Sequence, residues 1–299
     1  MFSLKYIKNR IRGVNSTKKI TQAMKIVAVS SLKKIQKNIC NSYDYIKILQ
    51  DLLINIQNLN CKFYEKNIFS KCKNNKNKTL FIVISSDRGL CGSFNSKIFN
   101  QVKNEIESNK KVKVFCIGNK LINYMRLNYR SHIVQEMPFF KTSNKKICYN
   151  KLILISKMIK KIFIKEKFHE CKIIYTEFHS IVKQNIKKIQ ILPLEINQIN
   201  KLSKQSKKTK NFNRIIYGYE GDLEIILEQI VNKYMSALFF NIHLNSLSSE
   251  YSARMLAMDS ATQNAKRMLR ELSLFYNRSR QSIITKELTE IISGAEAIN

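Results

Sequence analysis

The chain has 299 residues, and its 53 Lys and Arg residues against 21 Asp and Glu give a formal charge of +32. Such a charge fits a nucleic acid or another acidic partner. However, the lysines are spread along the whole sequence, Asn and Ile are abundant, Gly and Pro are scarce, and Trp is absent. We therefore interpret the charge mainly as the result of A+T-rich codon usage.

The cysteines and histidines exclude two further classes of protein. The seven cysteines are odd in number and form no CxxC motif, and the four histidines show no metal-ligand spacing. This pattern predicts neither a disulfide framework nor a zinc site, and it favours a reducing compartment. We expect no metal and no cofactor.

The N-terminal segment predicts one long helix. From Leu4 to about Asn58 it contains a single glycine and no proline. Apolar and small residues recur at alternating spacings of four and three, at Ala28, Leu32, Ile35, Ile39, Ser42, Ile46, Leu49, Leu53 and Ile56. This heptad pattern is typical of a helix that winds around another helix.

A linker at residues 59–77 leads to a β-rich region at residues 78–196. Thr79–Ser86 is a continuous apolar stretch, as expected of a strand that is buried on both faces. Further strands are predicted at Lys111–Gly118, Cys171–Phe178 and Ile186–Leu194, with helices near Asn95–Glu107, Lys120–Leu127 and Lys151–Lys167. Strands that alternate with helices predict a Rossmann-like α/β domain with a largely parallel sheet.

One segment of this domain is a candidate for chemistry. Ser85–Ser93 (SSDRGLCGS) follows the first strand and opens a helix, where α/β folds bind phosphates. Its spacing fits neither GxGxxG nor the Walker pattern. The alternatives are a tight turn with Asp87 as a helix cap, which we favour, and a Cys91 thiol whose pKa is lowered at a helix N-terminus. We find no convergent acid–base pair and therefore no active site.

The C-terminal segment predicts a second long helix, after a Lys-rich linker at residues 197–213. Within residues 214–299, Leu223 to Ile292 contains no proline or glycine, and Gly294 is the expected stop. Such a helix is roughly 105 Å long. Its heptad seam comprises Tyr251, Met255, Met258, Thr262, Ala265, Leu269, Leu272, Tyr276, Ser279 and Ile283.

Both long helices adjoin the central domain, so they should run antiparallel if they touch. The predicted fold is α+β: an antiparallel two-helix coiled coil from the two chain ends, with residues 1–58 as its first helix, and a central Rossmann-like domain. The alternative is two separate bundle helices in an ordinary core. The C-terminal helix is longer by about fifteen residues and bears an apolar tip, which predicts a surrounding partner protein.

Three blocks of sequence resemble the gamma subunit of F-type ATP synthase. Ser3–Gln36 is similar to the N-terminal helix of that family, and Ser86–Asn95 (SDRGLCGSFN) to its central motif. Glu250–Ala297 is similar to its C-terminal signature, including SARMLAMDSAT, FYNRSRQSIIT and KELTEIISGAEA. The blocks occur in the order of the family and span the chain.

The resemblance implies a non-catalytic rotor subunit, the central stalk. Its coiled coil would turn inside a head of alpha and beta subunits, while its α/β domain would meet the epsilon subunit and the c-ring. Proton-driven rotation of the ring would thereby be coupled to ATP synthesis on the beta subunits. No nucleic acid and no small-molecule substrate are implied.

The resemblance also assigns contact residues. Those that would touch the catalytic subunit are Arg280, Gln281, Thr285, Arg254, Met24 and Lys25. Those near the epsilon subunit and the c-ring are Tyr217, Tyr219 and Glu220.

Two other functions remain as alternatives, a basic nucleic-acid-binding protein and a nucleotide-dependent α/β enzyme with helical arms. The sequence shows no signal peptide and no transmembrane span. We therefore expect a peripheral protein on the cytoplasmic side of a bacterial inner membrane.

Overall fold

The computed structural model describes residues 4–59, 78–109, 111–138, 145–193 and 220–296. The chain divides into two compact units. The first unit comprises Met1–Ser30 and Arg254–Asn299, and the second unit comprises Ser31–Ala253. The long helices α1 (Leu4–Leu59) and α7 (Leu223–Glu296) contribute residues to both units.

The first unit is an antiparallel pair of helices, as predicted. Lys25 Nζ of α1 lies 2.6 Å from Asp259 Oδ1 of α7, and Thr262 Oγ1 donates to Thr21 Oγ1 at 2.8 Å. From the first pair to the second the residue number falls in α1 and rises in α7, so the two helices run in opposite directions. The predicted seam of α7 is confirmed, because its members are the less exposed residues here: Met255, Met258, Thr262, Ala265, Leu269, Leu272, Tyr276, Ser279 and Ile283.

The seam of α1 extends further towards the N-terminus than the sequence analysis predicted. Residues with reduced exposure continue the alternating spacing of three and four at Leu4, Ile7, Ile11, Val14, Lys18, Thr21, Lys25 and Ala28. The prediction began only at Ala28, because three of these positions are polar or charged and interrupt the apolar pattern.

The predicted stop at Gly294 is wrong, since α7 continues through this residue to Glu296. An added Cβ at Gly294 would have nothing within 4 Å. A glycine in an exposed helix costs only about 1 kcal/mol relative to alanine, which lowers helix stability without ending the helix.

The second unit contains a five-stranded sheet in the order β3-β2-β1-β4-β5. Its strands are β1 (Thr79–Ile84), β2 (Val112–Ile117), β3 (Ile133–Met137), β4 (Glu170–Phe178) and β5 (Gln184–Leu192). All neighbours are parallel except β4 and β5, which form an antiparallel pair. The largely parallel sheet is therefore confirmed. Every residue of β1 is buried, as its continuous apolar sequence predicts for a central strand.

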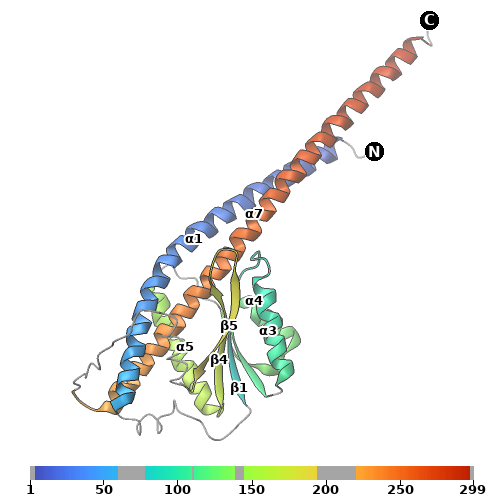
Figure 1. Ribbon diagram of the computed structural model, residues 1–299. Helices are drawn as coiled ribbons and strands as arrows, with labels where there is room; N and C mark the ends of the chain where they lie inside the picture. The colour runs from blue at the N-terminus through green and yellow to red at the C-terminus, as the bar shows by residue number, and fades with distance from the viewer. Residues whose placement is uncertain (1–3, 60–77, 110, 139–144, 194–219, 297–299) are drawn as a thin grey trace. The chain divides into compact units, whose positions relative to one another are not determined.

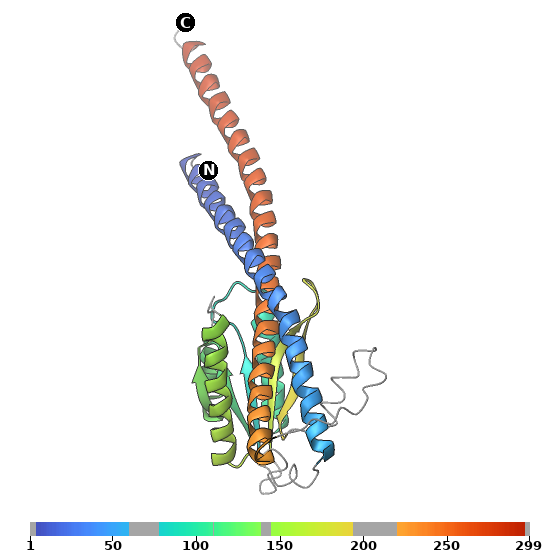
Figure 2. The same cartoon turned by 90° about the vertical axis from the view of Figure 1, so that its left-hand side faces the viewer.

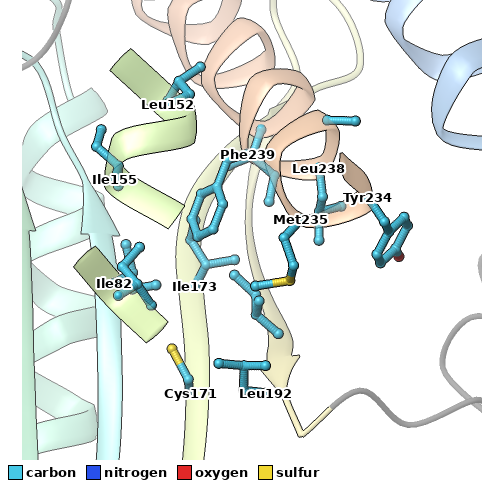
Figure 3. Close-up of a cluster of buried hydrophobic side chains, with 14 of the residues drawn as sticks. Ile82, Leu152, Ile155, Cys171, Ile173, Leu192, Tyr234, Met235, Leu238 and Phe239 are labelled. Atoms are coloured by element: carbon cyan, nitrogen blue, oxygen red, sulfur yellow. The ribbon is translucent and has the colours of Figure 1, made fainter. Parts of the chain in front are cut away.

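Helices cover both faces of this sheet (Figure 1). On one face, α3 (Phe94–Ser108) and α4 (Asn119–Asn128) pack against one set of alternate strand residues, including Phe81 and Val83. On the other face, α5 (Lys145–Lys165) and α7 pack against the intervening set, including Leu80 and Ile82. Figure 3 shows the side chains of this second core, among them Ile173 of β4 and Met235 and Phe239 of α7.

Within the second unit α1 also runs along α7 (Figure 2). Gln50 Nε2 donates to the hydroxyl of Tyr234 at 3.3 Å, and Asn241 Nδ2 donates to Ser42 Oγ at 3.0 Å. Burial raises the pKa of Tyr234, while the hydrogen bond from Gln50 opposes this rise. The helices are thus antiparallel in this unit too.

Strand β3 and the short 3₁₀ helix η1 (Arg130–His132) were not predicted. β3 is an edge strand of five residues, all half-buried, and its sequence IVQEM has polar residues in the middle. Neither a continuous apolar run nor a regular alternation marks such a strand.

One glycine fixes the loop geometry at the carboxyl ends of β1 and β2. Gly118 has φ +108°, and a Cβ there would lie 2.5 Å from the carbonyl oxygen of Ser85. Only a residue without a side chain permits this approach.

We therefore expect Gly118→Ala to lower the free energy of unfolding by about 2–4 kcal/mol, from backbone strain and steric overlap together. Gly13→Ala is the matched control, because Gly13 lies inside α1 with nothing within 4 Å of an added Cβ. It should raise stability by up to about 1 kcal/mol. Urea unfolding of the full chain, monitored by circular dichroism, checks both values. Equal effects of the two substitutions would contradict the close approach of the backbone at Gly118.

Candidate functional site

The end of α7 presents an exposed apolar surface, which we call the tip, residues 284–295. Every residue of the tip is exposed, although its sequence is rich in large apolar side chains. Ile291 is 68% exposed and Leu288 is 54% exposed. A cluster of this kind on a helix marks an interaction surface, because leaving it in water is unfavourable.

Three predicted contact residues lie where this surface begins, Arg280 and Gln281 just before it and Thr285 within it. Arg280, Gln281 and Thr285 are all exposed. Residues 281, 285, 288 and 292 are spaced by four, three and four, so they share one side of the helix. The Thr285 hydroxyl donates to the carbonyl oxygen of Gln281 at 3.0 Å. The structure thus places polar groups and apolar side chains on one continuous stripe.

Lys25, another predicted contact residue, forms an ion pair within the first unit. Its ammonium lies 2.6 Å from Asp259, and the two side chains are 40% and 37% exposed. Gln263 Nε2 donates to the other carboxylate oxygen of Asp259 at 3.2 Å. An ammonium has three N–H donors, so Lys25 can bind Asp259 and still donate to a further acidic group.

The remaining predicted contact residues are in different environments. Met24 is half-buried, and Arg254 is only 7% exposed, so little of Arg254 is open to a partner in this structure. Glu220 is exposed just before α7. Tyr217 and Tyr219 lie outside the described residues.

The segment Ser85–Ser93 is held together by its own polar groups. Asp87 Oδ1 accepts a hydrogen bond from the backbone N–H of Asn119 at 3.0 Å, so its carboxylate caps α4 rather than the helix that follows the segment. Ser86 Oγ donates to the carbonyl oxygen of Arg88 at 2.8 Å and accepts from Asn95 Nδ2 at 2.8 Å. These contacts favour the interpretation as a capped turn.

The free thiols in the described part of the chain are buried, at Cys91, Cys116 and Cys171. Cys91 is 2% exposed and receives a hydrogen bond from Asn95 Nδ2 at 3.2 Å. Burial, assisted by the charge of Glu136, raises the pKa of the Cys116 thiol to about 12. Neither side chain is accessible to a reactant in solvent.

The described residues contain no candidate metal site and no candidate membrane span. No group of three or more His, Cys, Asp or Glu side chains in those residues could hold a metal ion. Likewise, none of the helices in the described ranges combines the length and apolar character that crossing a membrane requires.

A polar layer in the coiled coil was not predicted from the sequence. It consists of the Thr21–Thr262 hydrogen bond and the adjacent Lys25–Asp259 ion pair. Thr262 was assigned to the seam, but its partner was not. The sequence does contain a signal for this partner. Thr21 lies seven residues before Ala28 and therefore occupies the same heptad position of α1.

We expect Thr262→Val to lower the free energy of unfolding by about 0.5–1.5 kcal/mol, because it removes a buried interhelical hydrogen bond while preserving shape. Thr289→Val is the matched control, since the exposed Thr289 hydroxyl donates to the carbonyl oxygen of Thr285 within its own helix. It should change stability by less than about 0.5 kcal/mol. Chemical unfolding of the full chain measures both. Additive effects of Thr21→Val and Thr262→Val would contradict the coupling of these two side chains.

Structures of known proteins share this fold. A chain from the Euglena gracilis mitochondrial ATP synthase, in a structure of OSCP, F1 and c-ring, superposes with a TM-score of 0.65 at 16% identity, covering 99% of this chain and 94% of the other. A chain from a structure of the Tetrahymena thermophila mitochondrial ATP synthase central stalk and c-ring superposes with a TM-score of 0.61 at 23% identity. This superposition covers 81% of this chain and 99% of the other.

Proteins that match by sequence share a higher identity with this chain than these structures do. The family model described as ATP synthase matches residues 3–298. The ATP synthase gamma chain of Pelagibacter ubique is 36% identical, covering 100% of both chains. The gamma chain of Clostridium kluyveri is 35% identical, and the alignment covers 98% of this chain and 97% of the relative. The gamma chain of Sinorhizobium fredii is 33% identical, and the alignment covers 100% of both chains. The chain therefore belongs to the ATP synthase gamma chain family.

Proposed function

We propose that the chain is the central-stalk rotor subunit of an F-type proton-translocating ATP synthase. It transmits rotation of a c-ring to a catalytic head of alpha and beta subunits and so couples proton flow to ATP synthesis. The observation that carries the proposal is the tip, an exposed apolar helix end that continues a paired coiled coil in a chain that the family model matches over residues 3–298. Such a surface fits a shaft that is enclosed by other proteins.

The proposal assigns catalysis to the partner beta subunits and not to this chain. The capped turn at Ser85–Ser93 supports this assignment, because its polar groups bond to each other and to α4. The comparisons also favour a gamma chain over the two alternatives, a nucleic-acid-binding protein and a nucleotide-dependent enzyme.

The mechanism requires one shaft to hold three chemically identical catalytic sites in different states. Shifting a two-state equilibrium from 1:99 to 99:1 takes about 5.5 kcal/mol of differential binding. Hydrogen bonds to charged groups contribute about 1.5–3 kcal/mol each, so a few of them suffice. In the proposed shaft, Arg280, Gln281 and Thr285 supply them at the start of the tip. All three are exposed, Gln281 and Thr285 lie on the apolar stripe and Arg280 lies beside it, so only the subunit facing that side of the helix would be engaged.

A second contact with the catalytic subunit is proposed at Met24 and Lys25, with Arg254 as a further candidate. The partly exposed ammonium of Lys25 is suited to an acidic partner segment. At the other end of the shaft, Tyr217, Tyr219 and Glu220 are proposed to face the epsilon subunit and the c-ring. The similar Tetrahymena chain belongs to a structure described as central stalk and c-ring, which supports this assignment.

We further propose the five-part organisation predicted from the sequence, with residues 1–58 and 214–299 as the shaft and residues 78–196 as the α/β domain. Residues 59–77 and 197–213 would then be linkers. The proposed location is the cytoplasmic side of a bacterial inner membrane, where the chain is peripheral. The bacterial origin of the similar gamma chains supports this location.

A reconstitution experiment tests the proposed function. The full chain, mixed with alpha and beta subunits of a related bacterial enzyme, should form a complex with one copy per three catalytic subunits and restore ATPase activity. A version that ends after Ser279 lacks the tip and should bind more weakly or give lower activity. If no complex forms with several compatible partners, the proposed rotor function is wrong. Nucleic-acid binding is then the next hypothesis to test.

The contact residues are tested in the same reconstituted complex. Arg280→Ala should lower the ATPase rate by about one to two orders of magnitude, because the loss of one charged hydrogen bond costs about 1.5–3 kcal/mol. Lys286→Ala is a matched control on the same helix, since Lys286 is equally a surface cation but pairs with Glu290. It should leave the rate within about twofold. Equal losses in the two variants would show that Arg280 has no specific role.

A further inference from the structure

Helix α7 crosses the carboxyl end of the sheet within the second unit. Tyr251 of α7 packs against the core that contains α5, whereas Ala253, two residues later, packs against the core beneath α3 and α4. One turn earlier the helix contacts β4 directly, because Ser249 Oγ donates to the carbonyl oxygen of Thr176 at 3.1 Å. Thr176 lies near the carboxyl end of β4, so α7 passes from one face of the sheet to the other at this point.

The crossing lies where the strand order of the sheet reverses. Strand β1 pairs with β2 on one side and with β4 on the other, and both pairs are parallel. In open α/β sheets, ligands bind in the crevice at the carboxyl ends of such strands. Here α7 covers the carboxyl end of β4. A ligand at this place must therefore be small enough to be enclosed between the helix and the sheet.

The residues that meet at the crossing are polar although they are buried. Ser246 is 1% exposed and Ser249 is 0% exposed, and their spacing of three residues places both on one side of α7. Thr176 is 4% exposed, and its side chain points to the same face of the sheet as Ile174, two residues earlier. Ala253 of α7 packs on that face too. Three hydroxyl groups thus lie in one buried region.

Two of these hydroxyls have no hydrogen-bond partner within the described residues. They are Thr176 Oγ1 and Ser246 Oγ, and both atoms are shielded from solvent. The Ser249 hydroxyl donates to the backbone of Thr176, and its lone pairs can still accept a hydrogen bond. A buried hydroxyl without a partner is costly, so buried polar side chains in native proteins are nearly always hydrogen-bonded.

A water molecule matches this group of atoms. A buried water typically makes about three hydrogen bonds to polar groups that the protein itself leaves unsatisfied. Here the hydroxyls of Thr176, Ser246 and Ser249 supply three partners. Each hydroxyl can donate or accept, and so can water, so all three groups can be satisfied together.

We propose that the crossing of α7 over β4 is a binding site for one buried water molecule, which bridges the hydroxyls of Thr176, Ser246 and Ser249. The water joins α7 to the sheet in addition to the direct hydrogen bond between Ser249 and Thr176. The site is independent of the proposed rotor function, because it uses only residues within 31–253.

Substitutions in the full-length chain test the site through its stability. Thr176→Val and Ser246→Ala each remove one partner of the water, so each should lower the unfolding temperature by about 2–4 °C. Both act on one water, so the double variant should lose less than the sum of the two effects. A hydroxyl that truly lacked a partner would behave differently, since its replacement by an apolar group is neutral or stabilising.

Ser252→Ala is the matched control for these substitutions. Ser252 is as buried as Ser249, but its hydroxyl donates to the carbonyl oxygen of Ser248 within α7 at 2.8 Å. This variant should shift the unfolding temperature by less than about 1 °C, because a serine that bonds back to its own helix contributes little to stability. Circular dichroism confirms that each variant is folded.

Two further measurements identify the ligand. Oxygen-17 magnetic relaxation dispersion detects long-lived buried waters, and it should show one fewer in the double variant than in the wild-type chain. Replacing sodium and potassium in the buffer by choline tests for a cation instead, because Glu250, which is 0% exposed, follows Ser249 in the sequence. A site for water should give the same unfolding temperature in both buffers.

Three outcomes would overturn the proposal. The first is an unfolding temperature that stays constant or rises in both Thr176→Val and Ser246→Ala. The second is equal relaxation dispersion in the wild-type chain and the double variant. The third is a stabilisation by sodium or potassium that the double variant loses, which would make the ligand a cation. None of these results depends on assembly with other subunits, so failure here and failure of the rotor function are distinguishable.

Discussion

The structure depends on the pairing of two helices that come from opposite ends of the chain. An isolated helix gains little stability in water, so α1 and α7 each need a partner for their narrow apolar stripe. Large apolar residues alone would leave the register of such a pair open. In the first unit, Thr21 bonds to Thr262 and Lys25 to Asp259, and these polar contacts are satisfied in one register only. The polar layer therefore contributes specificity, whereas the apolar seam contributes most of the stability.

Helix α7 meets very different surroundings along its length. Between Tyr234 and Glu250 every residue is buried or half-buried in the second unit, whereas residues 284–295 are all exposed. The buried stretch contains several small serines, and Ser249 Oγ donates to the carbonyl oxygen of Thr176 at 3.1 Å. Small side chains allow a helix to lie close to a sheet. The exposed stretch keeps apolar residues that nothing in its own chain covers within the described residues, which is the basis of the proposed shaft.

The α/β domain illustrates how a fold that often binds nucleotides can serve another purpose. Its parallel strands, and the turn that follows β1, resemble the place where such folds hold phosphates. Here Asp87 occupies the N-terminus of α4 and Gly118 brings two loops into close contact. A carboxylate at a helix N-terminus satisfies the positive end of the helix dipole from within the protein. The turn is thus stabilised by contacts within the protein, and α5 and α7 cover the face of the sheet opposite to α3 and α4.

The sequence by itself determined the two long helices, the seam of α7, the central strands and the exposed tip, because heptad spacing and continuous apolar runs are local signals. It also located Arg280, Gln281 and Thr285 beside the tip. Only the tertiary structure decided that Asp87 caps α4, that Lys25 pairs with Asp259, that Arg254 is mostly buried, and that IVQEM forms an edge strand. Each of these depends on residues that are distant in the sequence. Polar and mixed positions carry no periodic signal, so their partners are fixed only when the helices and strands pack.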